Sequence, residues 1–231
     1  MKSSEISFIQ YSEGKWQPQT AQIPLEQAVT LIVNGKPWFD MLCTPAMVTE
    51  LAVGFLFNEN LISSASDVTR VYVCDTNDFV EVDTRAPLSM PSTWIKTTGC
   101  GGGLTSQQLD QDENSTLNQV ALTANTISDL LKQFMEAQDV QTTSRGVHCS
   151  AISDGEKILV LADDIGRHNT LDKLAGFILL KDPSLEPSIV LTSGRISSEM
   201  LQKALRIGVS VVISLTSPNL NTIQLAEEMG L

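Results

Sequence analysis

The residues that could do chemistry are concentrated in one eleven-residue segment, Asp163-Asp164-Ile165-Gly166-Arg167-His168-Asn169-Thr170-Leu171-Asp172-Lys173. The start of an ordinary helix needs a capping side chain and an apolar stripe, but it does not need Arg, His and Asn side by side. Arg167 keeps its proton and suits an anion, whereas His168 lies four residues before Asp172 on the same predicted helical face. We expect the Asp172 carboxylate to orient the imidazole and to raise its pKa. The crowding favours a functional site over the alternative, a set of surface ion pairs at a helix start.

Two other polar clusters also follow predicted strands. Ser193-Gly194-Arg195 could form an anion cradle, because glycine admits a close approach, the following helix offers N–H groups and arginine presents a fork to phosphate. A structural cap is an equally good interpretation of these three residues. The third cluster is Thr216-Ser217-Pro218-Asn219, in which Ser217, like Asp164 and Asn169, could contact the polar edges of a ligand. Ligands of α/β sheets bind at the carboxyl ends of strands, so the sequence predicts one pocket where the three clusters meet.

One more histidine and one cysteine complete the candidates. His148 follows Gly146-Val147 in a predicted strand, where a packed and hydrogen-bonded histidine is more common than a catalytic one; either it or His168 could shuttle a proton. Cys100 lies between Gly99 and three further glycines, residues 101–103, which would leave its sulfur exposed on a pliable loop. A thiolate there could accept sulfur from another protein and carry it to the pocket, and the alternative is an inert loop cysteine.

The elements that must position these residues indicate two parts, a β-rich part over residues 1–104 and an α/β part over residues 105–231. In the first part we expect a hairpin over 28–42 that turns at Asn34-Gly35, a helix that begins near Pro45, and a strand pair over 70–74 and 79–83. We expect a mobile loop over 97–118. In the second part, strands and helices alternate. The predicted strands are 147–153, 158–161, 188–191 and 209–215, the last buried on both faces, and the predicted helices are 126–138 (capped by Thr126), 169–180, 197–207 and 220–229.

Composition excludes several classes of function. The chain has 231 residues and a net charge of −12, which argues against nucleic acid as a partner. It contains no run of eighteen apolar residues and its first residues lack an apolar signal region, so we expect a cytoplasmic protein without membrane contact. No two of its four cysteines have CxxC spacing, and the His-x-Glu and Pro-Cys-x-x-Cys motifs of zinc deaminases are missing, so we expect no metal site. Cys43 and Cys74 fit small buried hydrophobes.

Four segments together resemble the FdhD family, the accessory sulfurtransferases of formate dehydrogenase. Residues 51–59, LAVGFLFNE, are similar to the family's LAxGFLxxE helix motif, and residues 146–148 to its Gly-x-His. Residues 164–173 are similar to its D-[VI]-G-R-H-N-x-x-D-K. Residues 193–203, with Glu199 and Lys203, are similar to its S-G-R-x-x-x-E-x-x-x-K. The resemblance covers roughly residues 25–231, and its motif spacings make chance agreement a poor explanation.

The resemblance implies a function and a fold. Family members take persulfide sulfur from a cysteine desulfurase and pass it to the molybdenum bis-guanine-dinucleotide cofactor, which formate dehydrogenase then receives. It implies a homodimer, a cytidine-deaminase-like three-layer C-terminal domain, no permanently bound cofactor, and the persulfide role for Cys100. Ligand contacts would then come from His148, Asp164, Gly166, Arg167, His168, Asn169, Ser193, Gly194, Arg195 and Ser217.

Two departures from the family pattern keep other functions open. The family's loop carries a second cysteine three residues after the first, where this chain has Gly103, and the family usually continues past the last helix. A persulfide carrier needs only one nucleophile, so the sulfur-transfer hypothesis is kept. The alternatives are a cofactor-binding chaperone without sulfur chemistry and a nucleotide hydrolase on a deaminase-like scaffold.

Overall fold

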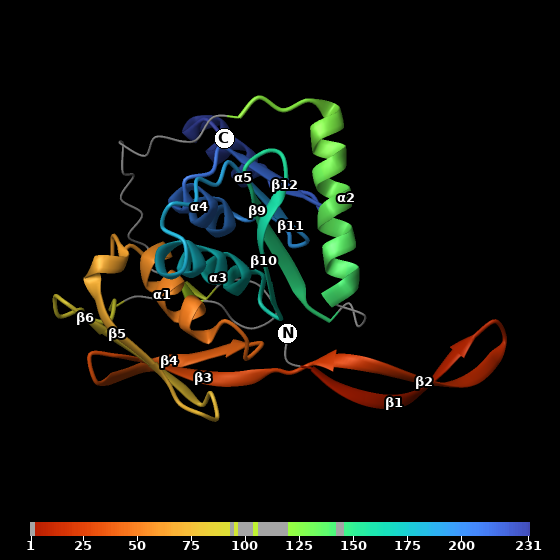
Figure 1. The fold of residues 1–231 in the computed structure, drawn as a ribbon, viewed down its shortest axis with the longest axis horizontal. Coiled ribbons are helices and arrows are strands. Elements are labelled where there is room, and N and C mark those ends of the chain that lie inside the picture. Colours follow the sequence, from red (N-terminus) through yellow and green to blue (C-terminus); the bar gives the residue numbers. More distant parts are fainter. Residues whose placement is uncertain (1–2, 93–94, 97–103, 106–119, 142–145) are drawn as a thin grey trace.

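The computed structural model describes residues 3–92, 95–96, 104–105, 120–141 and 146–231 (Figure 1). The C-terminal part is built on a four-stranded sheet in the order β10-β9-β11-β12. Strand β9 pairs antiparallel with both neighbours, and β11 pairs parallel with β12. The strands are β9 (His148–Ser153), β10 (Ile158–Asp164), β11 (Ile189–Thr192) and β12 (Val211–Ser214).

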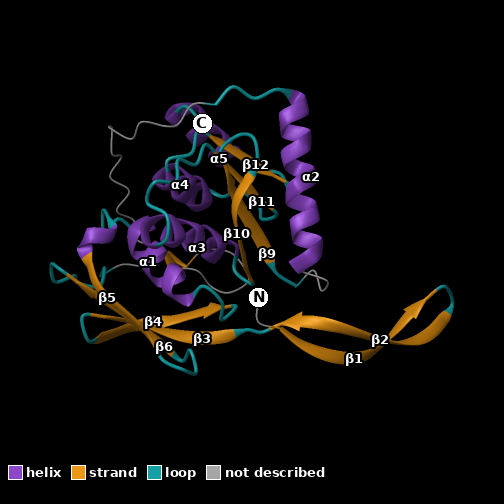
Figure 2. Cartoon of the chain, in the orientation of Figure 1, coloured by secondary structure: helices purple, strands orange, loops and turns teal. Residues whose placement is uncertain are grey.

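Helices cover both faces of this sheet, which makes three layers (Figure 2). On one face, α2 (Ala124–Gln141) buries Leu130 and Phe134 against Ala151 and its neighbours in β9 and β11. On the other face, α3 (Arg167–Leu180) and α4 (Ser198–Ile207) pack apolar side chains on the sheet, and α5 (Leu220–Met229) adds to this core. No helix in the described part of the chain is long and apolar enough to cross a membrane.

The N-terminal part has a second four-stranded sheet in the order β4-β3-β6-β5, with α1 (Val48–Asn58) packed on it. Outside these layers lie a two-stranded ribbon and shorter elements. The strands are β1 (Ser3–Ser12), β2 (Lys15–Pro24), β3 (Gln27–Val33), β4 (Lys36–Cys43), β5 (Val68–Val73), β6 (Phe79–Thr84), β7 (Ile95–Lys96) and β8 (Leu104–Thr105), and a 3₁₀-helix spans Ala65–Asp67.

Two glycines let α1 and α3 lie in backbone contact, which joins the two parts. A Cβ atom on Gly54 would stand 1.7 Å from the backbone oxygen of Asp172, and one on Gly176 would stand 1.9 Å from that of Glu50. No larger side chain fits there, because these distances are far inside van der Waals contact. The family-like helix motif around Gly54 is therefore a packing motif.

Most predicted elements are confirmed, including the mixed α/β class and the hairpin turn, where Asn34 and Gly35 both have positive φ. Two predictions are wrong in detail. The run over 209–215 is not buried on both faces, because β12 lies at the end of the described strand order and is half-buried. The hydroxyl of Thr123, rather than that of Thr126, caps α2 by accepting the Thr126 N–H at 3.1 Å. The predicted division at residues 104 and 105 and the deaminase likeness of the second part remain predictions, and the predicted loop over 97–118 falls mostly outside the described residues.

Candidate functional site

The three polar clusters lie at one edge of the C-terminal sheet. Strands β10, β11 and β12 end there and β9 begins there, because β9 runs antiparallel to its neighbours. The register places Asp164 opposite His148, and Thr192 opposite both Ser150 and Ser214. The predicted meeting of the clusters at one sheet edge is confirmed, and we call this region the strand-end edge.

Hydrogen bonds hold the first turns of the strand-end edge together. The Ser193 hydroxyl accepts the Cys149 N–H at 2.9 Å, and the Ser193 N–H donates to the Cys149 carbonyl at 2.9 Å. The Gly194 N–H donates to the Thr192 hydroxyl, and the Gly194 carbonyl accepts from Ser214. Since α4 begins only at Ser198, Ser193 and Gly194 lie before the helix and their N–H groups are already used. The N–H groups of Ser193 and Gly194 are therefore not available to a ligand, the anion cradle stays a prediction, and the exposed anion-binding group of the segment is the side chain of Arg195.

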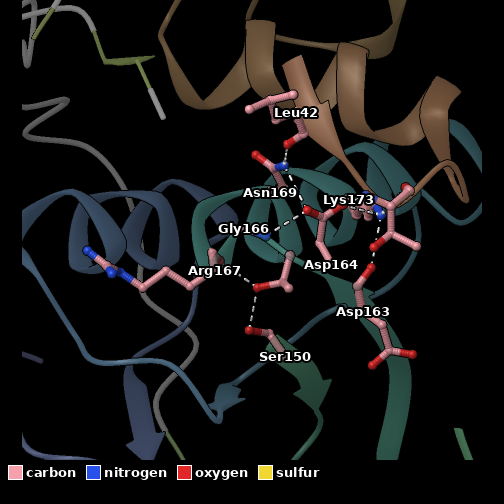
Figure 3. A network of polar contacts seen from close by, with 10 residues as sticks. Leu42, Ser150, Asp163, Asp164, Gly166, Arg167, Asn169 and Lys173 are labelled. Carbon is pink, nitrogen blue, oxygen red and sulfur yellow. Dashed lines mark hydrogen bonds and ion pairs between the residues drawn. The ribbon is translucent and has the colours of Figure 1, made fainter. Parts of the chain in front are cut away.

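Asp164 is the hub of an internal network (Figure 3). Its carboxylate is fully buried, accepts from the Gly166 N–H and the Asn169 amide, and pairs with Lys173 at 2.6 Å. Lys173 also donates to the carbonyls of Thr44 and Asp163. The same network reaches β4, because the Asn169 amide donates to the Leu42 carbonyl at 2.8 Å.

The polar groups of the Asp164 network form hydrogen bonds with other groups of the protein. Four of the motif's polar groups, those of Asp164, Gly166, Asn169 and Lys173, tie β10, α3 and the N-terminal part together. Their contact with a ligand stays a prediction. These hydrogen bonds hold in place the turn before α3, from which Arg167 and His168 project.

The Asp172 carboxylate binds Lys203 and Asn58 rather than His168. Both Asp172 oxygens accept from Lys203, at 2.6 and 2.8 Å, and one also accepts the Asn58 amide at 2.7 Å. Glu59 lies 3.6 Å from the same ammonium group. Burial opposes the charge of Lys203, but the carboxylates of Asp172 and Glu59 outweigh it and raise the pKa of Lys203. The prediction that Asp172 orients His168 is therefore wrong, because α4 brings a lysine to that carboxylate.

His168 is buried with one nitrogen unused. Its residue is 7% exposed, and Nε2 has no hydrogen-bond partner among the described residues. The nearest carboxylate oxygen is that of Glu199, 4.0 Å from Nε2. Burial, with the positive charges of Lys203 and Arg167, lowers the pKa of His168 to about 3, the reverse of the predicted rise. The imidazole is therefore neutral at pH 7 and can accept or donate one hydrogen bond.

Positive charge gathers around the two histidines. Burial and the guanidinium of Arg167 lower the pKa of His148, and Arg195 adds to the effect. Arg167 is buried at the start of α3, with its side chain directed away from Asp163 and Asp164 (Figure 3). A Cβ atom on Gly194 would stand 2.9 Å from Arg167 Cβ, so this glycine makes room for the arginine. A bound anion would offset the positive charges of Arg167 and Arg195.

The third cluster is more open. Ser217 is exposed beyond β12, and the Asn219 side chain caps α5 by accepting the Thr222 N–H at 2.9 Å. A cavity of about 340 Å³ adjoins this cluster and is lined by Ser214, Thr216 and apolar side chains of α4 and α5. It lies on the β12 side, and neither Arg167 nor Arg195 lines it. The cluster therefore joins the strand-end edge through the hydrogen bond from the Thr216 N–H to the Ser214 hydroxyl, while ligand contact by Ser217 stays a prediction.

The cysteines differ in environment. Cys100, the predicted nucleophile, lies outside the described residues. Cys43 and Cys149 are buried, and burial raises the pKa of Cys43 to about 12. Cys74 is half-exposed and not buried as predicted; its sulfur accepts the Asp78 N–H at 3.1 Å. Burial of its sulfur opposes ionisation, but hydrogen bonds from Thr76 and the turn lower the pKa of Cys74.

Asn58, Glu59 and Lys203 lie in the family-like motifs, but sequence reasoning assigned them no supporting role beneath the site, and it overlooked Thr44. Glu59, Asn58 and Thr44 come from the N-terminal part, and Lys203 comes from α4. A signal existed for two of them, because Glu59 and Lys203 are charged residues next to apolar helical positions. No group of three or more His, Cys, Asp or Glu side chains in the described residues is arranged to hold a metal ion.

Comparison with known proteins agrees with this arrangement. The chain is 34% identical over 227 residues to the sulfur carrier protein FdhD of Bacillus subtilis, a match that covers 96% of this chain and 87% of that protein. It is 31% identical over 230 residues to the sulfur carrier protein FdhD of Staphylococcus aureus, covering 97% and 87%. A crystal structure of a formate dehydrogenase accessory protein from Desulfotalea psychrophila superposes with a TM-score of 0.81 at 23% identity, covering 99% of this chain and 90% of that one. The sequence model of the FdhD/NarQ family matches residues 24–231, and the chain belongs to that family.

Proposed function

We propose that this protein is a sulfur carrier in the maturation of formate dehydrogenase. It accepts persulfide sulfur from a cysteine desulfurase and transfers it to the molybdenum bis-guanine-dinucleotide cofactor, its substrate, which the client enzyme then receives. The observation that supports this proposal most is that three of the four family motifs contribute to one strand-end edge, while the fourth packs beneath it through Gly54, Asn58 and Glu59. The names of the relatives from Bacillus subtilis and Staphylococcus aureus support the same role.

The first step is an exchange between two sulfur atoms. The Cys100 thiolate attacks the terminal sulfur of the donor's persulfide, the donor's S–S bond breaks, and the donor cysteine leaves as a thiolate. Cys100 then carries the new S–S bond, so the step needs neither an oxidant nor a reductant. Release of that sulfur as sulfide takes up two electrons, which a thiol or the metal centre of the substrate would supply.

The strand-end edge would receive the nucleotide parts of the substrate. Arg195 is exposed next to His148, so its guanidinium can form paired hydrogen bonds with a phosphate. His168 has a free nitrogen and stays neutral, which suits a hydrogen bond to the substrate or a proton transfer. We also propose that the protein works in the cytoplasm as a homodimer.

The carrier step is tested by incubating the protein with a cysteine desulfurase and cysteine, followed by mass spectrometry of the thiol peptides. We expect one added sulfur on the Cys100 peptide. Cys74 is the matched control, because it is half-exposed and its pKa is lowered, so indiscriminate persulfide chemistry would label it too. Sulfur on Cys74 and none on Cys100 would end the proposal.

A cofactor-binding chaperone is the second candidate, favoured by Gly103 at the position where the family has its second cysteine. The two functions separate in cells that carry Cys100→Ala. Loss of formate dehydrogenase activity supports sulfur transfer, provided that the variant is present at the normal level. Normal activity supports the chaperone, because such a protein needs the strand-end edge but not the thiol.

A further inference from the structure

The N-terminal ribbon has no supporting layer. Strands β1 and β2 pair in a continuous ten-residue register and form a sheet of their own, which extends away from the body (Figure 1). Its turn is regular, since Glu13 and Gly14 both have the positive φ that tight hairpins require. An isolated two-stranded ribbon is marginally stable in water. The ribbon therefore needs a partner that the described part of one chain does not provide.

Apolar side chains are exposed on both faces of the ribbon. Directly paired residues share a face, so Ile6 and Phe8 lie on one face and Ile9 and Tyr11 on the other. Trp16 is 72% exposed and packs beside Tyr11 with ring centroids 5.0 Å apart. Exposed apolar surface on this scale marks an interaction site. The exposed apolar residues of the ribbon are Ile6, Phe8, Ile9, Tyr11, Trp16 and Ile23.

The two edges of the ribbon differ in what they can pair with. The β2 edge carries Lys15, Pro18 and Pro24, and lysine and proline are the residues that keep an edge strand from pairing. All ten residues of β1 are described, and none is lysine or proline. No strand in the described part of the chain pairs with the outer edge of β1. The sequence thus protects one edge and leaves the other open.

We propose that β1 pairs antiparallel with β1 of a second copy of this chain, about a two-fold axis at Ser7, so that two ribbons form one four-stranded sheet. In this register Ile6 of one copy faces Phe8 of the other twice, and Glu5 faces Ile9, so no like charges are opposed. In this register residues 3–11 of the two copies are opposed, and these nine paired residues supply about nine hydrogen bonds between the chains, a number typical of a stable interface.

Charge also favours a second copy at this place. The described ribbon carries two carboxylates, of Glu5 and Glu13, and one ammonium group, of Lys15, a net charge of −1 in a chain of net charge −12. Two such acidic chains repel each other least where they are nearly neutral. A two-fold interface uses the same surface twice, and β1 supplies a self-complementary one. The family model begins at residue 24 and so does not include the ribbon. The pairing stands whether or not Cys100 carries sulfur.

A disulfide tests the register. Opposed residues of antiparallel strands have Cα atoms about 4.5–5.5 Å apart, which suits a disulfide. We expect mild oxidation of Ser7→Cys to give a covalent dimer whose peptide, found by mass spectrometry, is linked to itself at position 7. Thr20→Cys is the matched control, because Thr20 is exposed and directly opposite Ser7 within the ribbon but lies on the protected edge. No self-linked peptide at position 7, or an equal yield at position 20, would overturn the proposal.

Sedimentation of the uncrosslinked protein tests the association itself. We expect the wild type to have the mass of two chains, and Ser7→Lys, which opposes two ammonium groups at the axis, to weaken the dimer about tenfold or more. Thr20→Lys should leave the dimer intact, and equal melting temperatures would show that both variants fold. A monomeric wild type, or a dimer that Ser7→Lys does not weaken, would contradict the proposal. Neither result would affect the persulfide assay on Cys100.

Discussion

Lys173 and Lys203 lie inside the protein because each is matched by carboxylates. Lys173 pairs with Asp164 and donates to two carbonyls, and Lys203 pairs with Asp172 and lies near Glu59. A buried charge without a partner is strongly unfavourable, whereas a hydrogen-bonded pair is tolerated. The family-like motifs therefore encode an internal support beneath the proposed ligand site.

Removal of the Lys203 charge should be costly. We expect Lys203→Met to lower the free energy of unfolding by about 3–5 kcal/mol, because Asp172 and Glu59 would stay buried without their counter-ion. Urea denaturation measures the change. Lys132→Met is the control, since Lys132 and Glu136 form an exposed pair at 4.0 Å and should change stability by less than about 0.5 kcal/mol. Similar losses in both variants would contradict the assigned role.

His168 should make stability depend on pH. The unfolded chain takes up a proton near pH 6.5, and the folded chain does not until about pH 3, so stability is lost as the pH falls through this window. Between pH 7 and pH 5 this residue should cost about 2 kcal/mol. We expect His168→Gln to lose less stability than the wild type over that range in urea denaturation. Parallel losses in the two proteins would show that His168 titrates normally.

At the scale of elements, helix α1 touches α3 through backbone rather than through side chains. Gly54 and Gly176 create this contact, and Asn58 and Glu59 follow on the same helix to reach Asp172 and Lys203. The position of α3 in turn fixes the turn at Asp164 and the direction of Arg167. The glycines therefore support the strand-end edge from a distance.

A methyl group at this crossing should separate the helices. We expect Gly54→Ala to destabilise the protein by about 3 kcal/mol or more, because the added Cβ would overlap the Asp172 carbonyl. Gly208→Ala is the control: its φ is 93°, nothing lies within 4 Å of the added Cβ, and it should cost about 1 kcal/mol. Thermal unfolding compares the two. An equal or smaller loss for Gly54→Ala would show that the crossing relaxes easily.

The strand-end edge should bind the phosphates of a guanine nucleotide through Arg195. We expect Arg195→Ala to weaken the binding of guanosine diphosphate about tenfold in titration calorimetry, the loss typical of one charged hydrogen-bonding pair. Arg70→Ala is the control, because Arg70 is an exposed arginine on β5 that pairs with Glu81 and Asp83. If Arg70→Ala weakens binding as much as Arg195→Ala, the nucleotide binds through general charge rather than at this edge.

For the whole molecule, the net charge of −12 opposes any association of two copies. The nearly neutral ribbon reduces this repulsion but leaves the bodies charged. The proposed dimer should therefore respond to salt in a defined direction, because ions screen repulsion beyond about 10 Å at 0.1 M.

Salt should tighten the dimer. We expect its dissociation constant to fall severalfold as sodium chloride rises from low to physiological ionic strength, measured by sedimentation, because repulsion between the acidic bodies is screened. Thr20→Lys, which adds a positive charge away from the axis, should lessen this dependence. A dissociation constant that rises with salt would indicate ion pairs across the interface and would contradict a hydrogen-bonded and apolar ribbon contact.

The sequence by itself determined the α/β class, the hairpin at Asn34-Gly35 and the meeting of polar clusters at one sheet edge. These features follow from local periods and turn residues, which each segment carries alone. Only the tertiary structure decided that Asp172 pairs with Lys203 and not with His168, and that Asp164 pairs with Lys173. The spacing of Asp172 and His168 on one helix permits a contact. A buried carboxylate, however, pairs with a charged lysine in preference to a neutral imidazole when packing brings the lysine within reach. Which side chains packing brings together depends on residues far apart in the chain.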